Sequence, residues 1–296
     1  MTNQNNTTDK NVNLLDTVRR LHFVGIGGSG MCPMAEILHH KDYIITGSDI
    51  NESDTLARIR SYGIPVHMGH RAENIGDAEV VVYTAAAKQD NPELVAARAK
   101  GIPTLERSVM LGLLTKKFAN PIAVSGTHGK TTTTGMLTQI LIEAGRDPSA
   151  VIGGKLPLIG GYGKAGSGQS VVIEACEYHE TFLHLTCAVG VILNIDNVHL
   201  EYYGTMGKLK LAFQKFALLS RTVVFNMDDK NTMDVVNSID RPVLSFGIEE
   251  EARFRAVNIG EYKPGFFEFD VLELGEHFAH IKLGVPGYHN IYNALD

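Results

Sequence analysis

The sequence predicts an α/β protein of two consecutive domains, each built on a parallel β-sheet. Two observations carry this prediction. Short apolar runs alternate with helix-length segments, and this alternation starts afresh near the middle of the chain. From about residue 253 the pattern changes to alternating polarity, which predicts antiparallel strands at the edge of the second domain.

The first domain is predicted over residues 19–119. Residues 21–27 form an apolar run that ends at glycines, the pattern of a buried parallel strand. An apolar helix pattern follows through Leu38, and the alternation continues, so we expect a Rossmann-like parallel sheet with helices on both faces. The remaining strands and helices are predicted at residues 43–46, 55–62, 65–67, 79–84 and 92–100.

The second domain is predicted over residues 120–296, as a P-loop ATPase-like α/β domain. A strand at 122–125 leads into a glycine loop and a helix at 130–143, which Gly145 closes as a C-cap. Residues 153–168 contain seven glycines without periodicity, and we predict a functional loop there, with a flexible connector as the alternative. Strands are predicted at 171–175, 189–194 and 222–226, a helix at 208–219, and edge strands at 254–259, 266–274 and 277–283.

Composition excludes several classes of protein. Apolar residues make up 44% and charged residues 20% of 296 residues, as in an ordinary globular protein large enough for two cores. The net charge of −6 gives no footprint for nucleic acid or an anionic membrane surface. No apolar run reaches the roughly 18 residues that a membrane helix needs. The composition does not indicate an oligomeric state.

The N-terminal segment and the cysteines indicate a cytoplasmic protein. The first residues are polar and lack an apolar core, so residues 1–18 are predicted to be a disordered tail and not a signal peptide. Three cysteines without metal-ligand spacing indicate free thiols in a reducing compartment. His277 and His280 lie in a strand pattern that predicts side chains on opposite faces, which argues against a metal site.

The strongest motif is a glycine loop between a strand and a helix. Backbone N–H groups of such a loop point at phosphate oxygens, the lysine neutralises charge, and the following hydroxyl can hold Mg²⁺. Val124 stands where the common P-loop has its first glycine, so this loop is shorter. The loop predicts nucleotide binding by Gly126, Thr127, His128, Gly129, Lys130, Thr131 and Thr132.

A second glycine motif, residues 25–30, follows the first strand, and Asp49 ends the second strand 19 residues beyond Gly30. This is the dinucleotide fingerprint: glycines allow close approach to a diphosphate, and the acid can bind a ribose hydroxyl. Alone it would predict NAD, but UDP also supplies a diphosphate beside a ribose. A tight glycine turn without a ligand is the alternative.

Acidic and imidazole groups follow two strands of the second domain. Glu174 and Glu177 close one strand, and His199 follows another. In a P-loop fold such strand ends surround the terminal phosphate, where a carboxylate can complete a magnesium shell. Near the C-terminus, His289 and Asn293 are spaced by one helical turn and could share one planar base, although a helix cap at Asn290 also explains the pattern.

Together these segments resemble the Mur ligase family. HFVGIGGSGM, TGSD, GTHGKTTTT, EACEYHETFL, NIDNVHLEYY and GYHNIYNAL occur in the family's order and at about its spacing, over residues 21–296. The resemblance implies that the first domain binds the UDP of a sugar substrate and the second binds Mg-ATP. The implied UDP-sugar residues are Gly27, Gly28, Ser29, Gly30, Met31 and Asp49.

The resemblance also implies roles for residues of the second domain. Thr131, Glu174 and His199 match positions that serve magnesium, and His289 and Asn293 match those that hold adenine. Lys130, Glu174 and His199 are the implied catalytic residues. The implied reaction joins L-alanine to UDP-N-acetylmuramate in peptidoglycan synthesis: the sugar carboxylate attacks the γ-phosphate of ATP, and the amine then attacks the acyl phosphate.

Three departures from the family pattern stand out. Val198 replaces an Asp before His199, which leaves that histidine without a supporting polar partner, and Cys176 replaces a frequent Asp. The chain also stops before the family's third, C-terminal ligase domain, so we expect a fragment that binds its substrates but does not turn over by itself. The alternatives are a ligase for recycled murein tripeptide, an NAD-dependent oxidoreductase, and a non-catalytic nucleotide- or UDP-sugar-binding fragment.

Overall fold

The computed structural model describes residues 14–296, which form two compact units. The first unit comprises residues up to 118 together with 147–171, and the second comprises 119–146 and 172–296. Residues 147–171, which lie inside the second domain in sequence order, thus belong to the first unit. Within residues 14–296, no helix is both long and apolar enough to cross a membrane.

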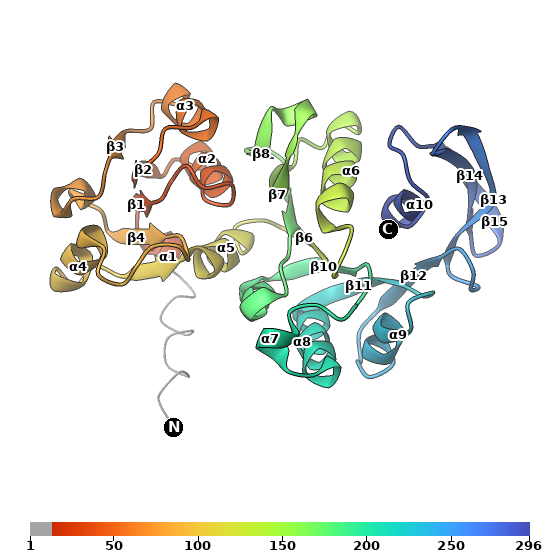
Figure 1. The fold of residues 1–296 in the computed structure, drawn as a ribbon. Coiled ribbons are helices and arrows are strands. Elements are labelled where there is room, and N and C mark those ends of the chain that lie inside the picture. Colours follow the sequence, from red (N-terminus) through yellow and green to blue (C-terminus); the bar gives the residue numbers. More distant parts are fainter. Residues whose placement is uncertain (1–13) are drawn as a thin grey trace. The chain divides into compact units, whose positions relative to one another are not determined.

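The first unit contains a five-stranded sheet in the order β3-β2-β1-β4-β5, and every neighbouring pair is parallel. This confirms the predicted parallel sheet (Figure 1). Its elements are α1 (Leu14–Thr17), β1 (Arg20–Val24), α2 (Cys32–His40), β2 (Ile44–Asp49), α3 (Asp54–Ser61), β3 (Val66–Met68), the 3₁₀ turn η1 (Ala72–Ile75), β4 (Val80–Tyr83), α4 (Pro92–Ala99), β5 (Thr104–Glu106) and α5 (Arg107–Thr115).

The central strand and α2 form much of the core of this unit. Phe23 on β1 and the α2 residues Met34, Ile37 and Leu38 are completely buried. The apolar spacing on α2 explains this, because residues three and four apart lie on one helix face. Because the strands are parallel, their carboxyl ends lie at the same edge of the sheet, and the glycine motif is at this edge.

The prediction of a loop at residues 153–168 is wrong, because the segment up to residue 164 belongs to a hairpin. Antiparallel strands β7 (Ser149–Leu156) and β8 (Gly161–Lys164) are joined by the 3₁₀ turn η2 (Pro157–Ile159). Arg58 holds the hairpin to α3 by donating to the carbonyls of Ile159 at 2.8 Å and Gly163 at 3.1 Å. Glycine lowers strand propensity, so the pattern concealed strands that tertiary hydrogen bonds hold in place.

In the second unit, eight strands follow the hydrogen-bonded order β15-β14-β13-β12-β11-β10-β6-β9. Pairing is parallel from β6 through β10, β11 and β12 to β13, and antiparallel from β13 to β15, which confirms the predicted antiparallel edge (Figure 1). The strands are β6 (Asn120–Ser125), β9 (Ser170–Glu174), β10 (Cys187–Ile192), β11 (Ser220–Asn226), β12 (Val243–Gly247), β13 (Phe254–Lys263), β14 (Phe266–Glu273) and β15 (Glu276–Lys282).

Helices cover this sheet and close its core. The helical elements are α6 (Lys130–Glu143), the 3₁₀ segment η3 (Tyr178–His184), α7 (Leu200–Tyr203), α8 (Met206–Leu219), α9 (Lys230–Val236) and α10 (His289–Leu295). Phe182 stacks on Phe216 of α8 with ring centroids 4.9 Å apart. On the other side, Ile291 and Leu295 of α10 join the core that contains Phe269 of β14. This packing fixes α10 close to α6.

Two predictions need correction: the length of the N-terminal tail and the orientation of two histidines on β15. The predicted tail reached residue 18, but Leu15 in α1 and Val18 directly after it are buried; residues 1–13 lie outside the described residues. The prediction that His277 and His280 face opposite sides is wrong. A β-bulge in the β14–β15 ladder brings both imidazoles towards Asp270 Oδ1, at 3.7 and 2.8 Å. An extra residue in one strand reverses the alternation of faces.

Candidate active site

The glycine loop of the second unit connects β6 to α6, as predicted. Gly126 and Gly129 have φ of +136° and +87°, values that side chains disfavour, so glycine is needed at both positions. An added Cβ on Gly129 would collide with Oδ1 of Asn293. The first N–H groups of α6 have no acceptor within the helix, and its dipole favours an anion there. The loop is therefore shaped to receive phosphate.

Asn194, which the sequence analysis did not single out, clamps this loop. Its backbone carbonyl accepts from Thr127 N at 3.0 Å, and its side-chain Oδ1 accepts from His128 N at 2.8 Å. Its Nδ2 donates in turn to the His128 carbonyl at 3.1 Å. In the sequence it is the last residue of the strand predicted at 189–194 and the first residue of the segment NIDNVHLEYY. The clamp fixes the loop before any ligand binds, which reduces the entropic cost of binding.

Lys130 is held inward by the loop and by Glu177. Its Nζ donates to the carbonyls of Gly126 at 2.5 Å and Thr127 at 3.1 Å, and lies 3.0 Å from Glu177 Oε2. The Glu177 side chain is 1% exposed, so its charge is compensated within the protein. Glu177 is thus the buried partner of the loop lysine, a role that its position after the strand did not reveal.

Oxygen atoms suited to magnesium lie together beside the loop. Thr131 Oγ1 donates to Glu174 Oε2 at 2.8 Å. Hydroxyl and carboxylate oxygens are hard donors that fit Mg²⁺. Within residues 14–296, no three His, Cys, Asp or Glu side chains are arranged to hold a metal ion. A magnesium ion here would therefore take further oxygens from phosphate and water, which is how Mg²⁺ usually binds beside nucleotides.

His199 has polar partners despite Val198. Its Nδ1 lies 3.4 Å from Glu201 Oε1, and its Nε2 lies 3.6 Å from Glu177 Oε1. The Tyr178 ring also contacts the imidazole, with centroids 4.6 Å apart. The expectation that His199 lacks a supporting polar partner is therefore wrong. Glu201, two residues later, is one of these partners.

The two predicted adenine-binding residues have different environments. Both lie on α10, but His289 is exposed while Asn293 is 6% exposed and lies against Gly129. Asn293 Nδ2 donates to Asn290 Oδ1 at 2.8 Å. Asn290 itself does not cap α10, because its Nδ2 donates to the Pro286 carbonyl and the cap position is Tyr288. Asn293 therefore joins the phosphate loop to α10.

The glycine motif of the first unit forms one wall of a pocket of about 400 Å³. Of the predicted UDP-sugar residues, Gly27, Gly28 and Asp49 line it, whereas Ser29, Gly30 and Met31 do not. Met31 is 1% exposed, so its side chain belongs to the core. The other lining residues are Val24, Gly25, Ile50, Asn51, Ser53, His70, Thr84, Ala86 and Ala87.

Asp49 holds the glycine turn in this structure. Its carboxylate accepts from the backbone N–H groups of Gly27 at 2.9 Å, Ile50 at 2.8 Å and Asn51 at 3.1 Å. A cation that the motif did not contain also lies at the turn. Arg107, the first residue of α5, has its guanidinium Nη1 2.8 Å from the place where a Cβ on Gly30 would stand. Positive charge beside a glycine turn suits a diphosphate.

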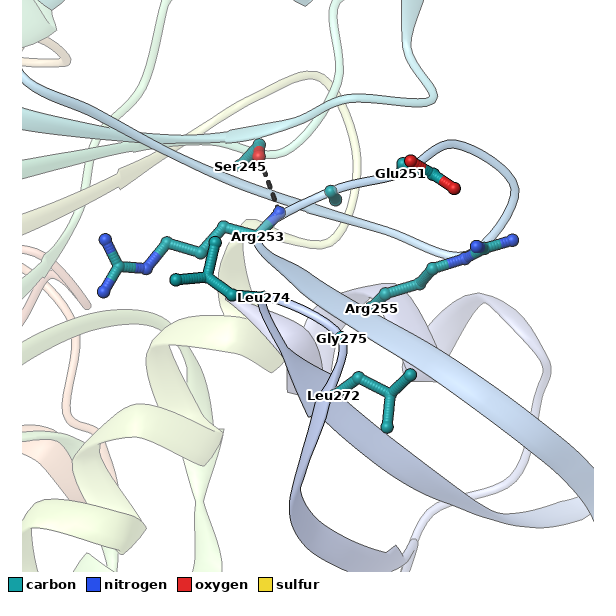
Figure 2. Close-up of a pocket in the computed structure, with 8 residues that line it drawn as sticks. Ser245, Glu251, Arg253, Arg255, Leu272, Leu274 and Gly275 are labelled. Carbon is teal, nitrogen blue, oxygen red and sulfur yellow. Dashed lines mark hydrogen bonds between the residues drawn. The ribbon is translucent and has the colours of Figure 1, made fainter.

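A second pocket, of about 460 Å³, lies along β12, β13 and β14 and contains no predicted site residue (Figure 2). Arg253 N donates to Ser245 Oγ at 2.9 Å, and the Arg253 guanidinium bonds Glu273 at 2.7 Å. The Arg255 guanidinium donates to the Ile248 carbonyl at 3.2 Å. Both guanidinium groups therefore have acceptors within the protein.

Comparison with known proteins gives relatives that span both units. A UDP-N-acetylmuramate–L-alanine ligase from Caldanaerobacter subterraneus subsp. tengcongensis is 41% identical, over 95% of this chain and 62% of its own length. The enzyme of that name from Acetivibrio thermocellus is 43% identical, over 94% and 60%. The chain thus spans about three fifths of the length of the curated relatives it matches.

Solved structures of Mur ligases also resemble the chain. UDP-N-acetylmuramate–alanine ligase from Thermotoga maritima superposes with a TM-score of 0.80 at 32% identity, covering 93% of this chain and 63% of that one. UDP-N-acetylmuramate:L-alanyl-γ-D-glutamyl-meso-diaminopimelate ligase from Neisseria meningitides gives 0.81 at 26% identity, covering 94% and 91%. Family models for the Mur ligase catalytic domain and the Mur ligase middle domain match residues 20–119 and 124–296. With its glycine turn, its phosphate loop and these matches across both units, the chain belongs to the Mur ligase family.

Proposed function

We propose that this chain carries the sugar-nucleotide and ATP sites of an enzyme that joins L-alanine to UDP-N-acetylmuramate in peptidoglycan precursor synthesis. The observation that supports it most directly is the phosphate loop with Thr131 and Glu174 hydrogen-bonded at 2.8 Å beside Lys130. The substrates follow from the relatives named as L-alanine ligases, which are 40–44% identical. The glycine pocket of the first unit would hold the UDP.

The reaction brings together two anions, the sugar carboxylate and the γ-phosphate of ATP, so charge neutralisation and alignment are the main tasks. Lys130 would exchange Glu177 and the loop carbonyls for phosphate oxygens. The loop N–H groups, fixed by Asn194, would orient the phosphates without reorganisation. Thr131, Glu174 and His199 would serve magnesium, which supplies further neutralisation of phosphate charge when bound. Attack of the carboxylate forms an acyl phosphate and ADP, and the amine of alanine then displaces phosphate.

Binding of each substrate to its own unit can be tested by calorimetry. We expect UDP-N-acetylmuramate and Mg-ATP each to bind the chain, and NAD to bind more weakly than the UDP-sugar. Tighter binding of NAD than of the UDP-sugar would contradict the proposal and favour an oxidoreductase, in which the phosphate loop has no role.

A ligase for recycled tripeptide is the second candidate. The Neisseria enzyme, whose name includes L-alanyl-γ-D-glutamyl-meso-diaminopimelate, superposes with a TM-score of 0.81, and the Thermotoga alanine ligase with 0.80. Calorimetric titration of the chain, saturated with UDP-N-acetylmuramate, with either L-alanine or the tripeptide separates the two. Binding of the tripeptide alone would replace the first candidate by the second.

A further inference from the structure

A buried carboxylate lies beneath the pocket of the first unit. The side chain of Glu93, in the first turn of α4, is 0% exposed. Its Oε2 accepts from Ser48 Oγ at 2.6 Å, and its Oε1 accepts from Asn74 Nδ2 at 2.5 Å. Burial would raise the pKa of this carboxyl, but the His22 imidazole and the hydrogen bonds outweigh it and lower the pKa to about 2. The group is therefore an anion at neutral pH.

His70 connects this anion to the pocket. Its Nδ1 lies 3.1 Å from Glu93 Oε2 and 3.1 Å from Ser48 Oγ, and the residue lines the pocket. An ionised carboxylate can only accept hydrogen bonds, so the imidazole proton that faces Glu93 lies on Nδ1 of His70. Because the buried acid holds this nitrogen, it sets the orientation of the ring. Among residues 14–296, no hydrogen bond or ion pair reaches Nε2 of His70. This atom is left for a ligand.

The position of His70 in the sheet indicates which part of a ligand it meets. The glycine turn follows β1, Asp49 ends β2 and His70 follows β3, and these strands are neighbours in the order β3-β2-β1. Adjacent strands are about 4.8 Å apart, so the end of β3 is roughly 10 Å from the glycine turn. A nucleotide with its diphosphate at the turn would extend its nucleoside, and not its phosphates, towards β3.

We propose that His70, oriented by Glu93, hydrogen-bonds the nucleoside part of the ligand in this pocket. Nε2 of His70 is the binding atom, and Glu93 is a positioning residue that acts through the ring. This inference rests on the proposed function, which makes the ligand a uridine diphosphate sugar. His70 lies outside the glycine motif and is distinct from Asp49 at the end of β2, so it is a further binding residue of this pocket.

His70→Ala tests the contact in the 296-residue chain, with UDP as the calorimetric probe. Loss of one hydrogen bond should weaken UDP binding about 5- to 10-fold. Inorganic pyrophosphate, measured by competition, should bind both proteins equally, because it lacks the nucleoside. His67→Ala is the matched control, since His67 is exposed on β3 and does not line the pocket; its UDP affinity should equal that of the unchanged chain.

Glu93→Gln tests the positioning role, because glutamine keeps the shape and removes the charge. It should weaken UDP binding by itself but cause no further loss in the His70→Ala background, a coupling that general destabilisation would not produce. Thermal unfolding of each variant shows separately whether it is folded. An equal loss from Glu93→Gln in both backgrounds would overturn the positioning role.

Two outcomes overturn the main inference: unchanged UDP affinity in His70→Ala, or an equal loss for UDP and pyrophosphate, which would place His70 on the phosphates. These results leave the proposed function standing, because the unchanged chain still binds UDP. Failure of the unchanged chain to bind UDP, with Mg-ATP binding retained, would instead remove the sugar-nucleotide site, and this inference with it.

Discussion

Gly129→Ala tests whether the phosphate loop depends on the absence of a side chain at its last residue. Gly129 has φ of +87°, and an alanine in this left-handed region costs about 1–2 kcal/mol. The added Cβ would also collide with Oδ1 of Asn293, which is 6% exposed and bonded to Asn290. Because the buried amide cannot move freely, the loop itself must shift.

Gly145→Ala is the matched control, because Gly145 lies at the other end of the same helix. Its φ is +67°, and an added Cβ would meet nothing within 4 Å. Both variants therefore carry backbone strain of about 1–2 kcal/mol, but only Gly129→Ala disturbs the loop. We expect Gly145→Ala to lower thermal stability slightly and leave nucleotide affinity unchanged. Gly129→Ala should weaken Mg-ADP binding at least ~10-fold, which corresponds to about 1.4 kcal/mol.

Calorimetric titration with Mg-ADP and a thermal melt of both variants provide the measurement. Wild-type affinity in Gly129→Ala would show that the loop tolerates the contact with Asn293, and the steric reasoning would be refuted. Equal losses of affinity in the two variants would refute it as well, since strain alone would then explain the effect.

Three further variants test other parts of the molecule. Lys130→Ala should nearly abolish ATP binding while UDP-sugar binding persists, because the two sites lie in different units; an equal loss of both ligands in calorimetry would contradict this. Glu174→Ala should weaken magnesium-dependent nucleotide binding more than Glu177→Ala, because Glu177 bonds the lysine and not the hydroxyl beside the metal position; the reverse order would sink the assignment. Arg58→Ala should lower the free energy of unfolding of the first unit by about 3–5 kcal/mol, because the 3% exposed Glu36 carboxylate loses its cation; urea denaturation measures this, and a loss below ~1 kcal/mol would be incompatible.

Local chemistry explains why much of the site could be predicted from sequence. A strand, a glycine loop and a helix are contiguous, so the places of Gly126, Gly129 and Lys130 follow from chain order and glycine's tolerance of positive φ. The parallel sheets follow from the alternation of apolar runs and helices. The strand-end positions of Glu174 and His199 pointed to the terminal phosphate, and the family resemblance then implied their magnesium roles.

Several contacts in the site join residues that are distant in the chain, and these depend on the tertiary structure. Asn194 clamps the loop from the segment that follows β10, and Arg107 reaches Gly30 from α5. Glu177 is buried against Lys130 only because the carboxyl ends of β6 and β9 lie together. The family resemblance implied Met31 as a ligand residue, whereas packing places its side chain in the core.

His277 and His280 show the same limit most directly. Strand alternation predicted opposite faces, but one extra residue in the β14–β15 ladder puts both imidazoles beside Asp270. Most strands, helices and glycine turns could be predicted from the sequence, because those preferences act between near neighbours in the chain; the glycine-rich strands β7 and β8 could not. Which side chains meet could not be predicted, because the contact of two distant residues depends on register, bulges and burial that no single segment specifies.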